Sequence, residues 1–485
     1  MPITTISGNV GGIRFPADSA LCMPTIFAFL FTGRPPGHYW TTLYFVLAAL
    51  VTPVTLWAQP TSSIDLSKAS RLMPLNDPTY RAAVSEQAAA QAELAKGRAG
   101  LLPVIQFSYS YNRVSGSRWQ PDFRGLRAES DLSYNSKNSY IQLRQPLLDF
   151  SRYATYQRGQ ALASRGSANF VVQQQRAGLR MAETYFNLLL AHNQHALNEA
   201  LAASLTSIVA TLQAKLRESE ATIIEVQETE ARLSLARADV IASQDQLAVS
   251  ARELQAIIGL PPLRIALIRN DFPLPTLSPT NIDEWLERGR LNNPETRAAQ
   301  EAVRVADAEV DQAGSQYLPT LNLMAAYGKT QSDSLSSLDQ RSNTFTVGLQ
   351  LEIPIFTGGY TTANVARTRA DRARLQYELG ATIERTQTAI TRAYTDTQRG
   401  AERIRALQSA VESGLKALES VKKGFDAGLQ SNLDVLNTQD KLFQARFDLV
   451  KAQVDYLRAR VTLSAAVGEL DTQVFDEIST TYLTP

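Results

Sequence analysis

The sequence predicts a mainly α-helical protein with a small β part, and three observations lead to this fold class. Residues after Pro354 carry a long series of apolar positions spaced by seven, with no further proline as far as residue 470. Four shorter segments alternate apolar and polar residues, as strands do. The same order of segments occurs twice. Because a strict seven-residue repeat is typical of coiled coils, we expect long antiparallel helices joined to one small sheet.

The longest predicted helix follows the residues Pro354-Ile355-Phe356-Thr357-Gly358-Gly359. It should run from about Thr361 to Phe425, a length of roughly 100 Å at 1.5 Å per residue. A tight turn near Gly428 should lead into a second, antiparallel helix. That helix carries its seven-residue repeat at Val435, Leu442, Leu449, Tyr456 and Leu463. The glycine pair before the long helix should let the chain bend from a strand into the helix.

An internal repeat organises most of the chain. Tyr185, Val226 and Gly259 correspond to Tyr394, Val435 and Gly468, each pair being 209 residues apart. We therefore predict a first repeat over residues 59–260, a proline-rich linker over 261–292 and a second repeat over 293–470. The sequence places no element in the tail at 471–485. In the first repeat, helical sequence should run from about 150 to 260 with a break near 217–220.

Residues 1–58 form a predicted signal and targeting region. An uncharged apolar segment spans residues 40–57, and Ala58 offers a small residue at a cleavage point. The alternative is a retained membrane helix, since the segment is close to the shortest spanning length. Cys22 is the only cysteine, and Leu21 before it argues against a lipid anchor.

Composition limits the partners and the chemistry. The formal net charge is +1, so no basic surplus is available for nucleic acid. His192 and His195 lie three residues apart on a predicted helix, but no cysteine or carboxylate cluster accompanies them. Gly358-Gly359 is followed by no Lys-Ser or Lys-Thr pair and is not a phosphate-binding loop. We predict no enzyme activity, no metal site and no cofactor.

Two strands should lie in each repeat, each about nine residues long. The predicted strands are residues 105–112, a strand after residue 138 that contains Ile141 and Leu143 and stops before Pro146, residues 320–328 and residues 344–353, with polar loops over 115–138 and 329–343. Tilted strands of this length can cross a bilayer, and Tyr109, Tyr111, Tyr140 and Tyr327 would suit an aromatic belt. Because four strands cannot close a barrel, spanning requires several copies. The alternative is a soluble sheet that caps a coiled coil.

Three segments resemble the TolC family of outer-membrane channel proteins, and the similarity covers about residues 63–470. The most specific segments are residues 354–359 at the strand-to-helix junction, residues 425–436 at the turn and residues 463–468 near the end. The resemblance implies a homotrimer in outer-membrane lipid, in which twelve strands form a barrel and twelve helices form a periplasmic tunnel. It also implies a periplasmic adaptor (membrane fusion) protein and an inner-membrane ABC or proton-driven transporter as partners.

The resemblance also assigns candidate pore residues. It places Asp434 in the periplasmic constriction, and Glu225, one repeat earlier, in the contacts that close the tip. Gln430 replaces the family's arginine, Phe425 lacks a tyrosine hydroxyl, and Asn437 stands where a second acidic ring would be. We therefore expect polar or apolar contacts, not a charge-assisted network, to hold the tip closed.

The resulting hypothesis is a passive exit duct whose energy comes from the inner-membrane partner. Members without a lipid anchor resemble secretion channels, so we favour type I export of a large protein such as a cyclolysin-type toxin. One alternative is a multidrug or small-molecule efflux channel. An alternative of another class is a structural coiled-coil protein of the cell envelope that has no pore.

Overall fold

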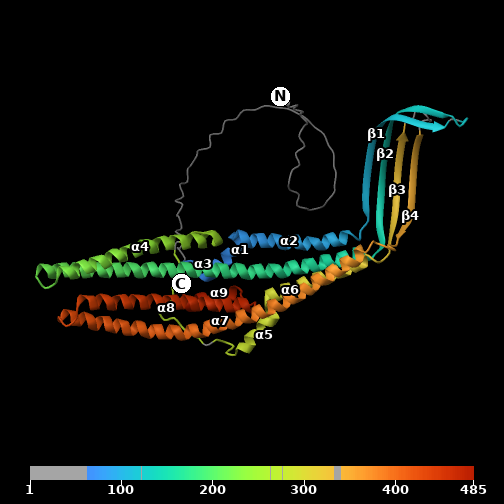
Figure 1. The fold of residues 1–485 in the computed structure, drawn as a ribbon. Helices are drawn as coiled ribbons and strands as arrows, with labels where there is room; N and C mark the ends of the chain where they lie inside the picture. Colours follow the sequence, from blue (N-terminus) through green and yellow to red (C-terminus); the bar gives the residue numbers. More distant parts are fainter. Residues whose placement is uncertain (1–62, 122, 263, 276, 333–339, 485) are drawn as a thin grey trace, which may run out of the picture. The chain divides into compact units, whose positions relative to one another are not determined.

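A computed structural model describes residues 63–121, 123–262, 264–275, 277–332 and 340–484 (Figure 1). The predicted signal region and Cys22 lie outside these residues. The helices are α1 (Leu66–Asn76), α2 (Pro78–Ala99), α3 (Phe150–Arg217), α4 (Ile223–Ile258), α5 (Ile282–Asn292), α6 (Pro294–Ser315), α7 (Tyr360–Asp426), α8 (Asn432–Ala466) and α9 (Thr472–Tyr482). The strands are β1 (Val104–Pro121), β2 (Arg127–Asp149), β3 (Thr320–Ser332) and β4 (Gln340–Glu352).

The long helices begin and end close to the predicted positions. α3 ends at the predicted break, and α7 extends one residue beyond the predicted helix at each end. Corresponding caps open the two repeats, because the side chain of Asp77 accepts from Thr79 N–H at the start of α2 and that of Asn293 accepts from Thr296 N–H at the start of α6. Helix, two strands and a long helical hairpin therefore follow one another in the same order in both repeats.

The long helices lie side by side in one layer (Figure 1). α3 packs against α2 and α4, which follow each other along its length, and also against α6 and α8. α6 and α8 pack in turn against α7. Across the layer, α2 and α4 therefore lie on one side of α3, α6 and α8 lie on its other side, and α7 lies beyond α6 and α8.

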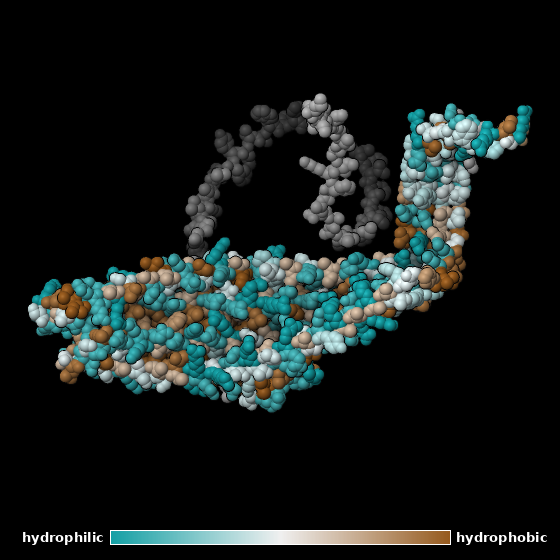
Figure 2. Space-filling view, in the orientation of Figure 1, coloured by the Kyte–Doolittle hydropathy of each residue, from teal (hydrophilic) through white to brown (hydrophobic). Residues whose placement is uncertain are grey.

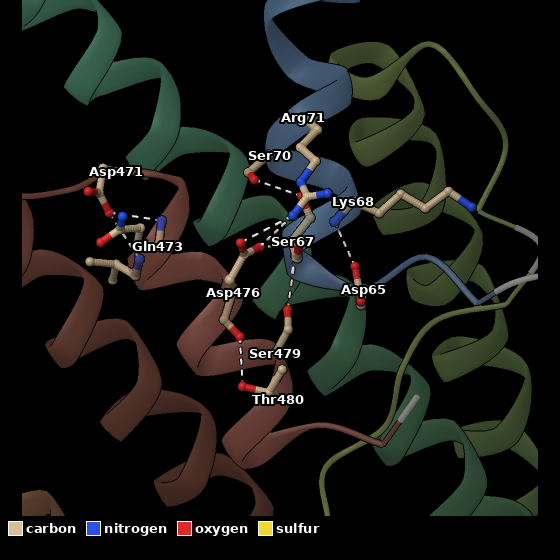
Figure 3. Close-up of polar contacts among 11 residues, drawn as sticks. Asp65, Ser67, Lys68, Ser70, Arg71, Asp471, Gln473, Asp476, Ser479 and Thr480 are labelled. Carbon is tan, nitrogen blue, oxygen red and sulfur yellow. Dashed lines mark hydrogen bonds and ion pairs between the residues drawn. The ribbon is translucent and has the colours of Figure 1, made fainter.

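Short helices cover the middle of this layer on one face. α1 and α9 pack against each other, and Tyr185, Tyr456 and Tyr482 are buried with them in the main hydrophobic core. Figure 3 shows polar contacts between α1 and α9, where Ser67 N–H donates to Ser479 Oγ at 2.9 Å and Arg71 pairs with Asp476 at 3.1 Å. The sequence reasoning left residues 471–485 without an element, whereas α9 supplies part of the core.

The strands form one antiparallel sheet in the order β1-β2-β3-β4. The predicted lengths of about nine residues are wrong, because the strands contain 18, 23, 13 and 13 residues. The predicted loop over 115–138 is largely a continuation of the β1–β2 hairpin, in which Val114 pairs with Tyr134 and Pro121 with Arg127. β3 and β4 also enter the predicted loop at 329–343, of which residues 333–339 lie outside the described residues.

The second strand also passes through Pro146, where we had predicted that it ends. β2 continues to Asp149, and the pairing with β3 shifts between Pro146 and Leu148. A bulge removes the need for a ladder hydrogen bond at one residue, so a proline without an N–H group is tolerated there. The strand then continues directly into α3, whose first turn is capped by the Asp149 side chain.

The register separates the sheet into two faces, as the alternation predicted. Phe107, Ile141, Tyr327 and Phe345 pair in sequence across the four strands and share one face. One residue along, Ser108, Tyr140, Gly328 and Thr344 share the other face, so the prediction that Tyr140 joins the aromatic belt of Tyr109, Tyr111 and Tyr327 is wrong. Apolar side chains gather at the end of the sheet that adjoins the helices (Figure 2). Among the described residues, no helix combines the length and apolar character needed to cross a membrane.

Candidate functional site at the two helical turns

The two helical hairpins begin their return helices with the same hydrogen-bonded motif. Thr222 and Glu225 form a capping box at the start of α4, and Ser431 and Asp434 form one at the start of α8. In each, the hydroxyl accepts from the backbone N–H of the acid, at 3.3 Å for Glu225 and 3.2 Å for Asp434. The acid in return accepts from the N–H of the cap residue, at 2.8 Å and 3.1 Å. Sequence reasoning missed this role, although a hydroxyl residue with an acid three positions later is its known signature.

Asp434 lies exposed at the start of α8. Its Oδ2 atom accepts from the Ser431 hydroxyl at 2.7 Å and from the Ser431 N–H group at 3.1 Å. These two donors, the hydroxyl first, hold the pKa of Asp434 below its ordinary value. The side chain is therefore a fixed negative charge at the turn, and its place in a pore constriction stays a prediction.

Phe425 and Gln430 shape the α7–α8 turn. Gln430 N–H donates to Gly424 O at 3.2 Å, and a side chain at residue 424 would begin 2.8 Å from Gln430 Cγ. Gly424 therefore leaves room for the side chain of Gln430 to fold back over the end of α7. The Lys215 ammonium group of α3 lies 4.8 Å from the centre of the Phe425 ring, which joins the ends of the two hairpins.

A charge-assisted contact joins α4 to α8 near the turns within the chain, and how the tip of an assembled channel is held closed stays a prediction. The Arg232 guanidinium donates to Asn437 Oδ1 at 3.1 Å and also pairs with Asp440 and, at 3.4 Å, with Glu228. Asn437 therefore contributes a neutral acceptor to a network whose cation comes from the other hairpin. Arg232 could not be predicted as a contact residue, because no special motif surrounds it in the sequence.

Uncharged contacts support the same region. Asn432 donates to Thr229 Oγ1 at 3.0 Å, and both residues are buried between α8 and α4. Gln439 donates to Ser204 Oγ at 2.9 Å and so connects α8 to α3. The side chains of Glu225 and Asp434, in contrast, form hydrogen bonds inside their own turns. Among the described residues, α4 and α8 are joined through Arg232 and Asn432, and no hydrogen bond joins Glu225 to Asp434.

The strand-to-helix junction before α7 has the predicted bend. Residues 353–359 separate β4 from α7, with Pro354 as the second residue after the strand. Gly358 and Gly359 have φ values of 63° and 82°, in the left-handed region that residues with a side chain rarely occupy. Gly359 is the N-cap of α7 and provides no side-chain hydrogen bond. The corresponding junction in the first repeat uses Asp149 in place of the glycines, so the two repeats turn by different means.

The histidines have structural surroundings. His195 Nδ1 lies 3.2 Å from Ser243 Oγ and its Nε2 lies 3.4 Å from Glu199. Burial and the neighbouring His195 hold the pKa of His192 below its ordinary value. Within the described part of the chain, no group of three or more His, Cys, Asp and Glu side chains could hold a metal ion.

The helical layer with its four-stranded sheet defines a subunit of the TolC-like fold. The Campylobacter jejuni CmeC outer membrane channel matches with a TM-score of 0.71 and 18% identity, over 88% of this chain and 91% of that one. A family model described as outer membrane efflux protein matches residues 71–260 and 285–469. The chain belongs to this family, and it is an outer-membrane protein.

Two relatives carry names that refer to secretion. The alkaline protease secretion protein AprF of Pseudomonas aeruginosa is 33% identical over 341 residues, which cover 70% of each chain. The proteases secretion protein PrtF of Dickeya chrysanthemi is 30% identical over 376 residues, covering 76% of this chain and 81% of PrtF.

Proposed function

We propose that this chain is the outer-membrane exit duct of a type I secretion system and that its cargo is a secreted protein, with a protease as the first candidate. The names of AprF and PrtF, protease secretion proteins, support this cargo class. They favour a protease over the cyclolysin-type toxin that the sequence suggested. The duct is passive, and an inner-membrane transporter, joined through a periplasmic adaptor, supplies the energy.

The two open edges of an apolar sheet are the observation that supports a channel. Within the described residues, β1 and β4 are the two edges of the sheet, and each pairs on one side only. One face of the sheet bears apolar side chains such as Phe345 and Leu349, which are 73% and 66% exposed. Lipid tolerates no open strand edge, so an apolar sheet of this kind requires closure by further copies. Three chains supply twelve strands, whereas the eight strands of two chains would leave a lumen filled by side chains.

The helical turns would form the periplasmic end of the duct. Three copies place three Asp434 carboxylates around one axis, and such rings are a usual device for ion selection in channels. The Arg232 network holds α4 against α8 within each chain. We propose that it keeps the end narrow until the transporter and adaptor engage.

Complementation tests this function. The chain is expressed in a bacterium that retains a protease, its ATP-driven exporter and the adaptor but lacks their outer-membrane component. Extracellular protease activity should return, and it should not return with Leu349→Arg, which places a charge on the proposed lipid face. Restored resistance to small toxic compounds without protease export would favour the efflux alternative. A purified protein that forms neither trimers nor conducting pores in planar bilayers would favour a structural coiled coil.

A further inference from the structure

A row of arginines runs along one face of α7, away from the sites described above. Arg385, Arg392 and Arg399 lie seven residues apart, and Arg403 follows four residues later. Seven residues are close to two helical turns, so these side chains share one face. All four are exposed, and we call them the arginine track. Together with Arg458 of α8, they line a cleft of about 720 Å³ between α7 and α8.

The positive charge of this cleft is poorly compensated. Arg392, Arg399 and Arg403 form no ion pair or hydrogen bond with any described residue. Of the two aspartates in the lining, Asp455 pairs with Arg458 at 3.1 Å. Five arginines and two aspartates leave a surplus of three positive charges in the cleft, although the whole chain has a formal net charge of only +1. The surplus is therefore local and faces solvent.

The track lies on the uncovered face of the helical layer. Nine residues separate Tyr394 from Arg403, which corresponds to half a turn after two full turns, so the two side chains point in opposite directions. Tyr394 donates to Thr280 O in the linker, and α5 packs beside it through Trp285. On α8, likewise, Arg460 donates to Tyr482 Oη of α9 at 2.6 Å, whereas Arg458 lies on the other side of the helix and lines the cleft. The linker and the short helices thus cover one face, and the arginine track lies on the other.

Closure of three copies into a duct fixes which face is internal. A bore must be free of covering elements, so α1, α5, α9 and the linker have to lie outside. From this arrangement, which rests on the proposed function, we infer that the arginine track lines the bore and binds acidic stretches of an extended polypeptide in transit. Three copies carry twelve such arginines in one zone of the tunnel. Exposed charges of this kind bind weakly and reversibly, which suits a path along which cargo has to keep moving.

The inference can be tested by block of single channels. The probe is a synthetic peptide of twenty aspartates, added to purified trimers in planar bilayers on the side of the sheet. The variant Arg392→Gln/Arg399→Gln/Arg403→Gln should weaken the apparent affinity of the peptide by about tenfold or more, because exposed ion pairs are lost from each chain. Replacement of the same residues by lysine should preserve block. Block of the unmodified channel should fade at about 0.5 M salt.

The chain offers a matched control two residues away. Arg405 is also exposed on α7, but it lines the cleft under the linker on the covered face. Arg405→Gln should leave block unchanged, and a glycine-serine peptide of equal length should block none of the channels. Full block of the triple glutamine variant, or an equal loss with Arg405→Gln, would overturn the inference while leaving the duct intact. A triple variant whose trimers fall apart would place the track at a contact between copies and overturn it as well. If the unmodified protein forms no trimeric channel, the proposed function is refuted, and the inference about the arginine track, which depends on it, is refuted as well.

Discussion

Asp434 combines a local structural role with an available charge. One carboxylate oxygen accepts two hydrogen bonds from Ser431, which fixes the orientation of the side chain at the start of α8. A negative charge in the first turn of a helix also interacts favourably with the helix dipole. Because the group is exposed and its pKa is lowered, it remains charged over the whole physiological pH range. A substitution that tests the charge of Asp434 therefore has to keep the hydrogen bonds that cap α8.

The first prediction tests the charge of Asp434 while the capping hydrogen bond is kept. Asp434→Asn keeps an oxygen that can accept from Ser431 but removes the negative charge. It should weaken block by divalent or trivalent cations applied from the periplasmic side and should lower cation selectivity. Asp434→Glu should preserve both properties, and trimer stability should stay nearly unchanged in both variants. Planar-bilayer recordings measure this, and unchanged block in Asp434→Asn would mean that the constriction lies elsewhere.

The second prediction concerns pH. The hydrogen bonds from Ser431 hold the pKa of Asp434 below its ordinary value, so cation block should persist to lower pH than for an ordinary aspartate. Ser431→Ala removes the first of these donors, so the midpoint at which block is lost should move to higher pH. Current recordings over an acid titration compare the two channels. Midpoints that coincide would show that the Ser431 hydroxyl does not set the charge at the turn.

The third prediction concerns Arg232. Arg232→Ala removes the cation from the α4–α8 network and leaves Asp440 without its partner. The resting conductance should rise, and the loosened contact should cost about 1 kcal/mol, a modest value because the network is partly exposed. Arg237→Ala is the control, since Arg237 is exposed on the same helix and pairs with no described residue. Equal conductance of the two variants would exclude Arg232 from closure.

At the scale of elements, the positions of the long helices and the alternating faces of the strands could be predicted, whereas the lengths of the strands could not. The seven-residue repeats, together with Gly358, Gly359 and the break at 217–220, located α3 and α7 to within about a residue. In the β1–β2 hairpin beyond Asn112, serines and charged residues occupy both faces, so period-two hydrophobicity disappears while the hydrogen-bonded ladder continues. For the turns, the resemblance supplied Asp434, Glu225 and Asn437. Arg232 could not be found because its role depends on α4 and α8 being side by side.

The fourth prediction tests the two faces of the sheet. Leu349→Arg or Val347→Arg places a charge on the apolar face, at a cost of about 2–4 kcal/mol if that face meets the middle of a bilayer. Thr346→Arg and Gln350→Arg alter the opposite face and should be tolerated much better. Trimer yield in outer-membrane extracts measures the difference. Equal yields from the two pairs would refute the assignment of inside and outside.

At the scale of the whole molecule, the main hydrophobic core joins distant parts of the sequence. α1 and the linker contribute Met73 and Phe272, and α9 contributes Phe475, Ile478 and Tyr482. A parallel bridge between Ile64 and Ile265 and an antiparallel bridge between Ile268 and Leu483 join the same segments. The long helices contribute narrow apolar seams, so much of the stability of the layer has to come from this covered middle.

The fifth prediction measures that contribution. Ile478 is 1% exposed in the core, so Ile478→Ala should destabilise the protein by about 2–5 kcal/mol and lower the unfolding temperature of the trimer. Thr480→Ala, on the exposed side of α9, should have a small effect. Thermal unfolding followed by circular dichroism compares them. A similar temperature for both variants would show that α9 is dispensable for the core.

The contact between α1 and α9 also has a consequence for the order of events during synthesis. Ser67 and Asp476 form a hydrogen bond although 409 residues separate them. Until α9 (Thr472–Tyr482) has been synthesised, the apolar surface that it buries with α1 and the linker has no cover. The chain therefore passes through a stage in which it needs protection from aggregation, and synthesis of α9 ends that stage. A chain that stops short of α9 would expose the apolar surface that Phe475, Ile478 and Tyr482 otherwise bury, so the surface that marks it as incomplete would lie in the helical layer and not in the sheet.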